Sequence, residues 1–142
     1  MPLALGDKTD TAFGGVPLML EGELVSISDG AYGGDGPILG GLSGSYGPGV
    51  VLRVDGIEIL VVTIAKQMLD LQQFKAFGIE PERTRVIALK SMQHFRAAFE
   101  PIAGQVIVCD SGALCTLHYD RLPYRNVPRP IFPLDPDAAW SD

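Results

Sequence analysis

The sequence predicts a mixed α+β domain, and three observations support that class. Apolar residues alternate along the N-terminal half, which also contains the turn pair Asp55-Gly56, as antiparallel hairpins do. The second half instead alternates short apolar runs with segments of helical period. Apolar residues make up 46% and charged residues 20% of the 142 residues, an ordinary globular composition. We therefore expect a single domain over residues 1–142.

The N-terminal half is expected to form antiparallel strands. Residues 16–28 predict a strand whose apolar phase slips at Gly22, where a β-bulge is the simplest explanation. Residues 50–64 predict the clearest hairpin, because the Asp-Gly pair favours a type I′ turn between two apolar runs. The returning run, 57–64, is apolar on both faces, so it is expected to be the central strand.

The second half predicts a β-α-β-α-β unit, which would make the sheet mixed. Its expected strands are the return of the hairpin, 85–89 and 105–109, and right-handed crossovers would make them parallel. Residues 70–77 predict a short helix. Ser91 is expected to cap a second helix, whose apolar stripe has helical spacing. That stripe consists of Phe95, Ala98, Phe99 and Ile102.

Residues 121–142 are rich in proline and predict an irregular, extended C-terminal tail. Arg121, Arg125 and Arg129 recur every four residues, but the intervening prolines forbid a helix. We expect these arginines to anchor the tail on carboxylates of the acidic N-terminal half.

Charge and hydropathy exclude several classes of function. The net charge is −6 with an isoelectric point near 4.8, which disfavours nucleic acid as a partner. No apolar run approaches the ~20 residues of a membrane span, and the N-terminus does not resemble a signal peptide. We therefore expect a cytoplasmic protein with no membrane partner. The two histidines are too few for a self-contained histidine-rich metal site, so no metal ligands are predicted in this chain.

Polar residues follow three of the expected strands: Ala65-Lys66-Gln67, Lys90-Ser91 and Asp110-Ser111-Gly112. Ligands of open α/β sheets bind beyond the carboxyl ends of the strands, so these residues are expected to gather at one edge. Asp110 itself has three interpretations: a catalytic acid, a metal ligand, or a residue that fixes an Asx turn.

Lys90, Ser91 and His94 are the main candidates for binding a substrate or another anion. A helix starting at Ser91 would offer free N–H groups and a favourable dipole, and Lys90 would add a positive charge. His94 lies one turn further on and could reach the same ligand. The structural alternative is a capped helix with a solvated lysine and a hydrogen-bonded histidine. Arg96, Asp110 and Lys8 are secondary candidates, with Arg96 expected on another face and Lys8 near the chain start.

Several runs of the sequence resemble one protein family. Residues 90–99 read KSMQHFRAAF and residues 129–135 read RPIFPLD. The segments LGDKTD at 5–10 and FGIEP at 77–81 fit the same pattern. The chain is similar to the C-terminal domain of the MlrC family, the microcystin-degradation proteins. It departs from the family pattern at Asp7 and in the segment after Asp110.

The resemblance implies a zinc metallopeptidase as the complete protein, with the zinc ligands in an N-terminal domain outside this sequence. The present domain would then hold no cofactor and be inactive alone. Its partner would be that N-terminal catalytic domain, and its candidate residues would contribute to the substrate cleft. The alternative is an interaction or oligomerisation domain, for example of a homodimer, without a direct role in the active site.

Overall fold

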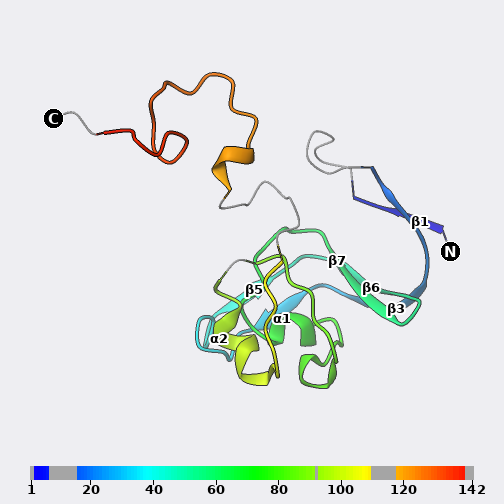
Figure 1. Cartoon of the computed structure of the whole chain (residues 1–142). Helices are drawn as coiled ribbons and strands as arrows, with labels where there is room; N and C mark the ends of the chain where they lie inside the picture. The colour runs from blue at the N-terminus through cyan, green and yellow to red at the C-terminus, as the bar shows by residue number, and fades with distance from the viewer. Residues whose placement is uncertain (1, 7–15, 92, 110–117, 140–142) are drawn as a thin grey trace.

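The computed structural model describes residues 2–6, 16–91, 93–109 and 118–139 (Figure 1). The strands are β1 (Pro2–Leu5), β2 (Leu18–Glu21), β3 (Glu23–Ser28), β4 (Ala31–Gly33), β5 (Ser43–Ser45), β6 (Gly49–Val54) and β7 (Ile57–Val62). The helices are α1 (Gln72–Lys75) and α2 (Arg96–Phe99), with 3-10 turns η1 (Pro81–Arg83), η2 (Glu100–Ile102) and η3 (Tyr119–Arg121). The predicted α+β class is confirmed.

The predicted hairpin forms as β6 and β7, which pair from Gly49↔Val62 to Val54↔Ile57. Asp55 and Gly56 have φ values of 47° and 81°, the positive values that a type I′ turn requires. The strand order of this sheet is β3-β6-β7, so β6 is central and β7 lies at an edge. The prediction of a central returning strand was wrong. The apolar residues on both faces of β7 led to the prediction of a central strand. Such a pattern does not determine whether a strand is central or at an edge.

The strand predicted over residues 16–28 is divided at Gly22 into β2 and β3. β2 pairs with β1 in a separate two-stranded ribbon, whereas β3 pairs with β6. The register irregularity lies between Leu24 and Ser26 rather than at Gly22 itself. The change of apolar phase thus marked a change of pairing partner.

The second half contains helices and turns, but the predicted parallel strands do not form in the part of the chain described. Residues 85–89 and 105–109 belong to no strand, and every described sheet is antiparallel. Val86 and Val108 are 82% and 73% exposed, whereas Ile87, Leu89 and Val106 are half-buried. Their composition favours a strand, but composition alone does not determine whether the backbone pairs with another strand.

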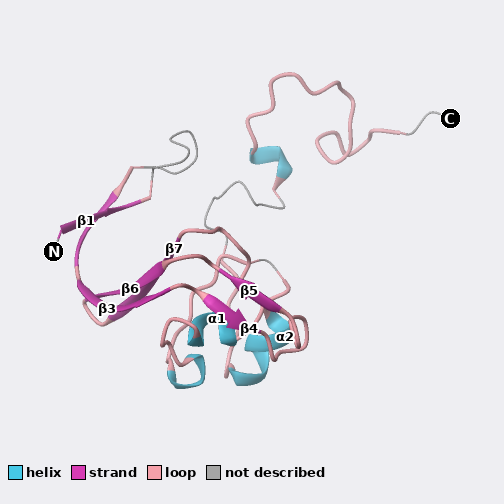
Figure 2. Ribbon diagram, turned by 180° about the vertical axis from the view of Figure 1, so that it is seen from behind, coloured by secondary structure: helices cyan, strands magenta, loops and turns pink. Residues whose placement is uncertain are grey.

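The helices are shorter than predicted and complete the core on one side of the main sheet (Figure 2). Phe77 and Val51 are 2% and 1% exposed and form a buried cluster with Tyr46 and Ile79. Phe74 of α1 packs against this cluster and also meets the ring of Phe99 edge to face, at 5.9 Å between centroids. α2 is thereby stacked on α1. None of the described helices is long and apolar enough to cross a membrane.

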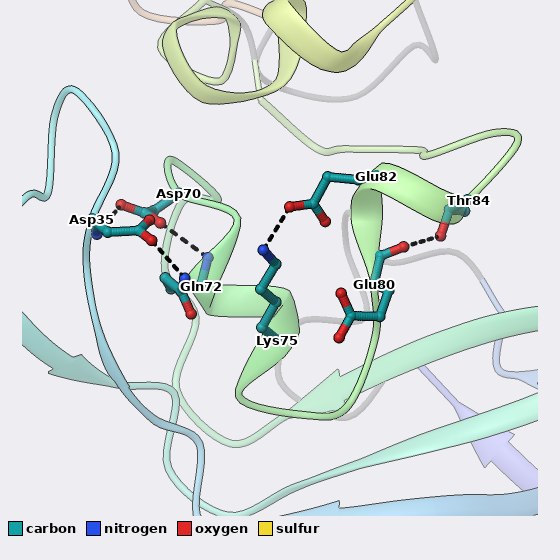
Figure 3. Close-up of polar contacts among 7 residues, drawn as sticks. All are labelled: Asp35, Asp70, Gln72, Lys75, Glu80, Glu82 and Thr84. Atoms are coloured by element: carbon teal, nitrogen blue, oxygen red, sulfur yellow. Dashed lines mark hydrogen bonds and ion pairs between the residues drawn. The ribbon is translucent and has the colours of Figure 1, made fainter.

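Two groups of polar contacts hold the loops around α1 (Figure 3). The carboxylate of Asp70 accepts hydrogen bonds from the backbone N–H groups of Asp35 at 3.1 Å and Gly36 at 2.8 Å, far away in sequence. On the other side of the helix, Lys75 Nζ lies 2.5 Å from Glu82 Oε1. These contacts tie the loop between β4 and β5, and the η1 turn, to the same short helix.

The proline-rich tail carries its own ion pair. The guanidinium of Arg129 pairs with both carboxylate oxygens of Asp135. The backbone N–H of Ile131 donates to the same carboxylate at 2.8 Å. The Arg129 guanidinium and, to a smaller extent, the Ile131 N–H together lower the pKa of Asp135 to about 2. For Arg129, the prediction of an anchor on the acidic N-terminal half was wrong, because the acid lies in the tail itself.

Candidate functional site

Two of the polar segments predicted to gather are in contact. The side-chain amide of Gln67 donates a hydrogen bond to the hydroxyl of Ser91, with Nε2 and Oγ 2.8 Å apart. Lys66 and Lys90 are the residues next to them in sequence, and both are exposed. We call residues 66–67 and 90–91 the polar corner. The third predicted segment, which begins at Asp110, lies outside the described residues.

The polar corner is attached to the core through the backbone of Gln67. The buried hydroxyl of Tyr46 donates to the carbonyl oxygen of Gln67 at 3.0 Å. The buried amide of Gln73 donates to the Tyr46 hydroxyl at 2.8 Å and to the same carbonyl at 3.3 Å. On its other side, Gln73 Oε1 accepts the backbone N–H groups of Leu69 at 2.6 Å and Asp70 at 2.9 Å. One buried glutamine thus fixes the loop from which the Gln67 side chain reaches Ser91.

The buried tyrosine gives the fold a predicted alkaline limit. Burial raises the pKa of Tyr46 to about 12, and the neighbouring Tyr32 contributes to the rise. A tyrosine in the unfolded chain ionises near pH 10, so between pH 10 and pH 12 the unfolded state loses a proton that the folded state keeps. Stability is therefore complete below pH 10 and falls as the pH rises toward 12.

Urea unfolding followed across this pH range checks the prediction. The midpoint for the native sequence should fall more steeply above pH 10 than that of Tyr46→Phe. Tyr119→Phe, at an exposed position, is the matched control and should keep the native profile. Parallel profiles for the native chain and Tyr46→Phe would contradict a raised pKa at this site.

Ser91 does not cap a helix, so the prediction of a helix beginning at this residue was wrong. α2 begins only at Arg96 and is four residues long. The backbone before it turns at His94 and Phe95, and the Ser91 hydroxyl contacts Gln67 instead. The apolar stripe predicted a longer helix, but its last member belongs to η2, which begins with Glu100 and Pro101.

Two of the remaining candidates, His94 and Arg96, lie within the described residues, and the contacts recorded for them are local. His94 is exposed, and its carbonyl accepts the backbone N–H of Ala97 at 3.4 Å. Arg96 pairs with Glu100 at 3.0 Å and lies over the Phe95 ring, 5.5 Å from its centroid. This pairing agrees with the expectation that Arg96 faces elsewhere. Lys8 and Asp110 lie outside the described residues.

A zinc site is not formed by the described part of this chain. Zinc in proteins takes three or four ligands from cysteine, histidine, aspartate and glutamate. Within residues 2–6, 16–91, 93–109 and 118–139, no three such side chains come together in a way that could hold a metal ion. The donor set therefore does not fit a zinc centre, and no catalytic step can be assigned to one here.

Comparison with known proteins identifies the family. The family model described as MlrC C-terminus matches residues 1–126. The chain belongs to the MlrC C-terminal family. A Sphingomonas protein named Microcystinase C is 27% identical over 137 residues, which cover 94% of this chain but 25% of that protein. The chain thus spans about a quarter of the relative it matches.

A solved structure shares the fold of this MlrC C-terminal chain. It is titled "Putative metallopeptidase" from Mesorhizobium sp. BNC1 and aligns with a TM-score of 0.78 at 22% identity. The alignment covers 99% of this chain and 28% of that one.

Sequence reasoning missed the buried polar residues that support the corner. Tyr46 lies in a glycine-rich segment. Gln73 lies on a short helix of which only the apolar residues were considered as core residues. Glutamine is rarely buried, so composition offered no reason to select Gln73. A glutamine on the core-facing side of a predicted helix was the signal available, because a buried amide requires partners.

Proposed function

We propose that this chain is the C-terminal domain of an MlrC-like metallopeptidase and that it contributes the polar corner to the substrate cleft of the complete protein. The observation that carries the proposal is the Gln67–Ser91 hydrogen bond, which couples the Lys90-Ser91 segment to the buried Tyr46–Gln73 pair. An exposed cationic segment with a fixed backbone support is suited to binding an anionic group. The family membership provides the peptidase context.

In this proposal, Lys90 supplies charge, Ser91 supplies a hydroxyl and His94 supplies an imidazole to a carboxylate of the substrate. An ammonium group binds a carboxylate as a compact point charge with three donors. The zinc and its ligands belong to the N-terminal region of the complete protein. The present domain binds and orients substrate, and it does not hydrolyse peptides on its own.

Alanine substitutions in the complete protein test this role. Lys90→Ala and His94→Ala should each lower kcat/KM by about tenfold, the loss expected when one charge-assisted contact of about 1.4 kcal/mol is removed. Because of the name of the Sphingomonas relative, microcystin is the first substrate to try, alongside its methyl ester. The loss should be smaller for the ester, in which the carboxylate charge is absent.

Arg83→Ala is the matched control, because Arg83 is an exposed cation in η1 and is not one of the polar-corner residues. It should leave kcat/KM within about twofold. Circular dichroism and urea unfolding would confirm that each variant is folded. Unchanged kinetics for both Lys90→Ala and His94→Ala would remove the corner from the active site.

The second candidate is an interaction domain without a direct role in catalysis. Its support is the number of exposed large apolar residues, such as Ile27 at 72% and Val86 at 82%. Sedimentation of the chain distinguishes the two. A stable dimer that is indifferent to anions favours the interaction domain, and a monomer that binds an anion at Lys90-Ser91 favours the peptidase role.

A further inference from the structure

The main sheet has one face made entirely of apolar side chains. Residues directly opposite one another in an antiparallel sheet share a face, so the register of β3, β6 and β7 assigns each side chain. Leu52 pairs with Leu24 and Ile59, and its neighbours two residues away along β6 continue the same face. This outer face comprises Leu24, Ile27, Val50, Leu52, Val54, Ile57, Ile59 and Val61.

The opposite face already has its covering layer. Val51 is 1% exposed in the core cluster, and its partner Ser26 donates a hydrogen bond to the carbonyl of Phe77 at 2.7 Å. At the far end of that face, Arg53 pairs with Glu58 at 2.8 Å and Glu23 at 3.6 Å. The core face is therefore apolar where the helices cover it and charged where they do not.

The outer face has no polar pattern, and three of its eight side chains are exposed in the described structure. Ile27 is 72% exposed, Ile57 66% and Leu24 51%, whereas Leu52 at the centre is 4% exposed and the other four residues of the face are half-buried. Phe74 of α1 packs with the core cluster that includes Val51, which places the helices on the other side of the sheet (Figures 1 and 2). An antiparallel sheet with one solvated face normally alternates apolar and polar residues. Apolar residues on both faces are typical of a sheet covered on both sides.

We infer that the outer face is the surface on which the N-terminal region of the complete MlrC-like protein docks. This inference rests on the proposed function, because it requires that the chain be part of a longer protein. The family match is to a C-terminus, and about three quarters of the Sphingomonas relative lies outside the region that this chain matches. That length of chain provides a covering layer. Three strands of six residues span roughly 14 by 20 Å, enough to seat one helix or one sheet layer.

A matched pair of double variants in the complete protein tests the docking surface. Ile27→Gln with Ile57→Gln changes the outer face, whereas Glu23→Gln with Glu58→Gln changes the core face of the same two strands. The outer-face pair should speed protease cleavage between the two regions by at least about tenfold, and the core-face pair by less than about twofold. Equal rates for the two pairs would overturn the inference.

Footprinting provides a second measurement that does not depend on the folding of a variant. A carbene label should modify Ile27 and Ile57 strongly in the 142-residue chain, in line with their exposure, and weakly in the complete protein. Equal labelling in the two would overturn the inference. So would protection that appears in the 142-residue chain alone and rises with concentration, because the occupant would then be a second copy.

The two proposals fail in different ways. Protection of the outer face together with unchanged kinetics for Lys90→Ala and His94→Ala would leave the docking surface standing and remove the catalytic role. The reverse result would keep the polar corner in the active site and place the domain contact elsewhere. A native protein of 15.2 kDa would overturn both, because no N-terminal region would exist.

Discussion

Asp70→Ala should lower the free energy of unfolding by about 4 kcal/mol, a large fraction of the stability of a domain this size. Asp70 is 0% exposed. Its Oδ2 accepts the N–H groups of Asp35 and Gly36, and its Oδ1 accepts that of Gln72 at 2.9 Å. Alanine would remove all three acceptors at once. A fully buried donor left without a partner costs about 1–3 kcal/mol, and these three part-buried donors together are expected to cost about 4 kcal/mol.

Two further variants separate this network from a general effect of losing an acid. Asp70→Asn keeps one carbonyl oxygen and should cost about half as much as alanine. Asp29→Ala removes an exposed aspartate that accepts a single N–H, from Ala31 at 3.0 Å, and should cost less than about 1 kcal/mol. Urea unfolding provides the free energies. Amide exchange at Asp35 and Gly36 should quicken in Asp70→Ala, and equal losses for Asp70→Ala and Asp29→Ala would contradict the network.

Local signals predicted those parts of the fold that depend on neighbouring residues. The Asp55-Gly56 turn fixed the β6–β7 hairpin, because its positive φ values select the register of the two strands. The short first helix was also predicted from a local residue pattern, over residues 70–77, and α1 covers Gln72–Lys75 within that range. An aspartate just before a helix also indicates a local acceptor, and Asp70 does accept the N–H of Gln72.

The errors arose where the structure depends on a distant partner. Nothing near Asp70 indicates that it also binds backbone 34 and 35 residues earlier. Residues 85–89 have strand composition but pair with no strand in the described structure, and a local pattern does not determine pairing. The outer face of the main sheet illustrates the same point. Its apolar residues predicted burial, whereas Leu24, Ile27 and Ile57 are exposed in the described structure.

At the candidate site, one expectation was confirmed and the reason given for it was wrong. The expectation that polar residues at segment ends gather was confirmed for Gln67 and Ser91, which are 2.8 Å apart. The reason given for it was wrong, because no parallel strand ends at Leu89 and no helix begins at Ser91. The contact depends instead on Tyr46 and Gln73, whose buried side chains donate hydrogen bonds to the backbone carbonyl of Gln67. The roles of Lys90, Ser91 and His94 in binding stay predictions.

Gly30→Ala should have the second largest effect, a loss of about 3 kcal/mol in the free energy of unfolding. Gly30 has φ +70°, and a Cβ there would lie 2.4 Å from the carbonyl oxygen of Gly47 and 3.0 Å from Cζ of Phe77. The contact with Gly47 involves a backbone atom, which cannot relieve the clash by a change of rotamer as a side chain can. Gly56→Ala is the matched control, because it has φ +81° with nothing within 4 Å.

Gly56→Ala therefore measures the cost of a positive φ alone, about 1–2 kcal/mol, and the excess for Gly30→Ala measures the clash. Urea unfolding of both variants provides the comparison, and equal losses would show that the close approach costs nothing.

Gly30→Ala should also affect the candidate site. The carbonyl of Gly30 accepts the N–H of Tyr46 at 3.0 Å, and the Tyr46 hydroxyl holds Gln67. Displacing Gly30 should therefore weaken the Gln67–Ser91 contact, visible as shifted side-chain amide signals of Gln67, whereas Gly56→Ala should leave those signals in place.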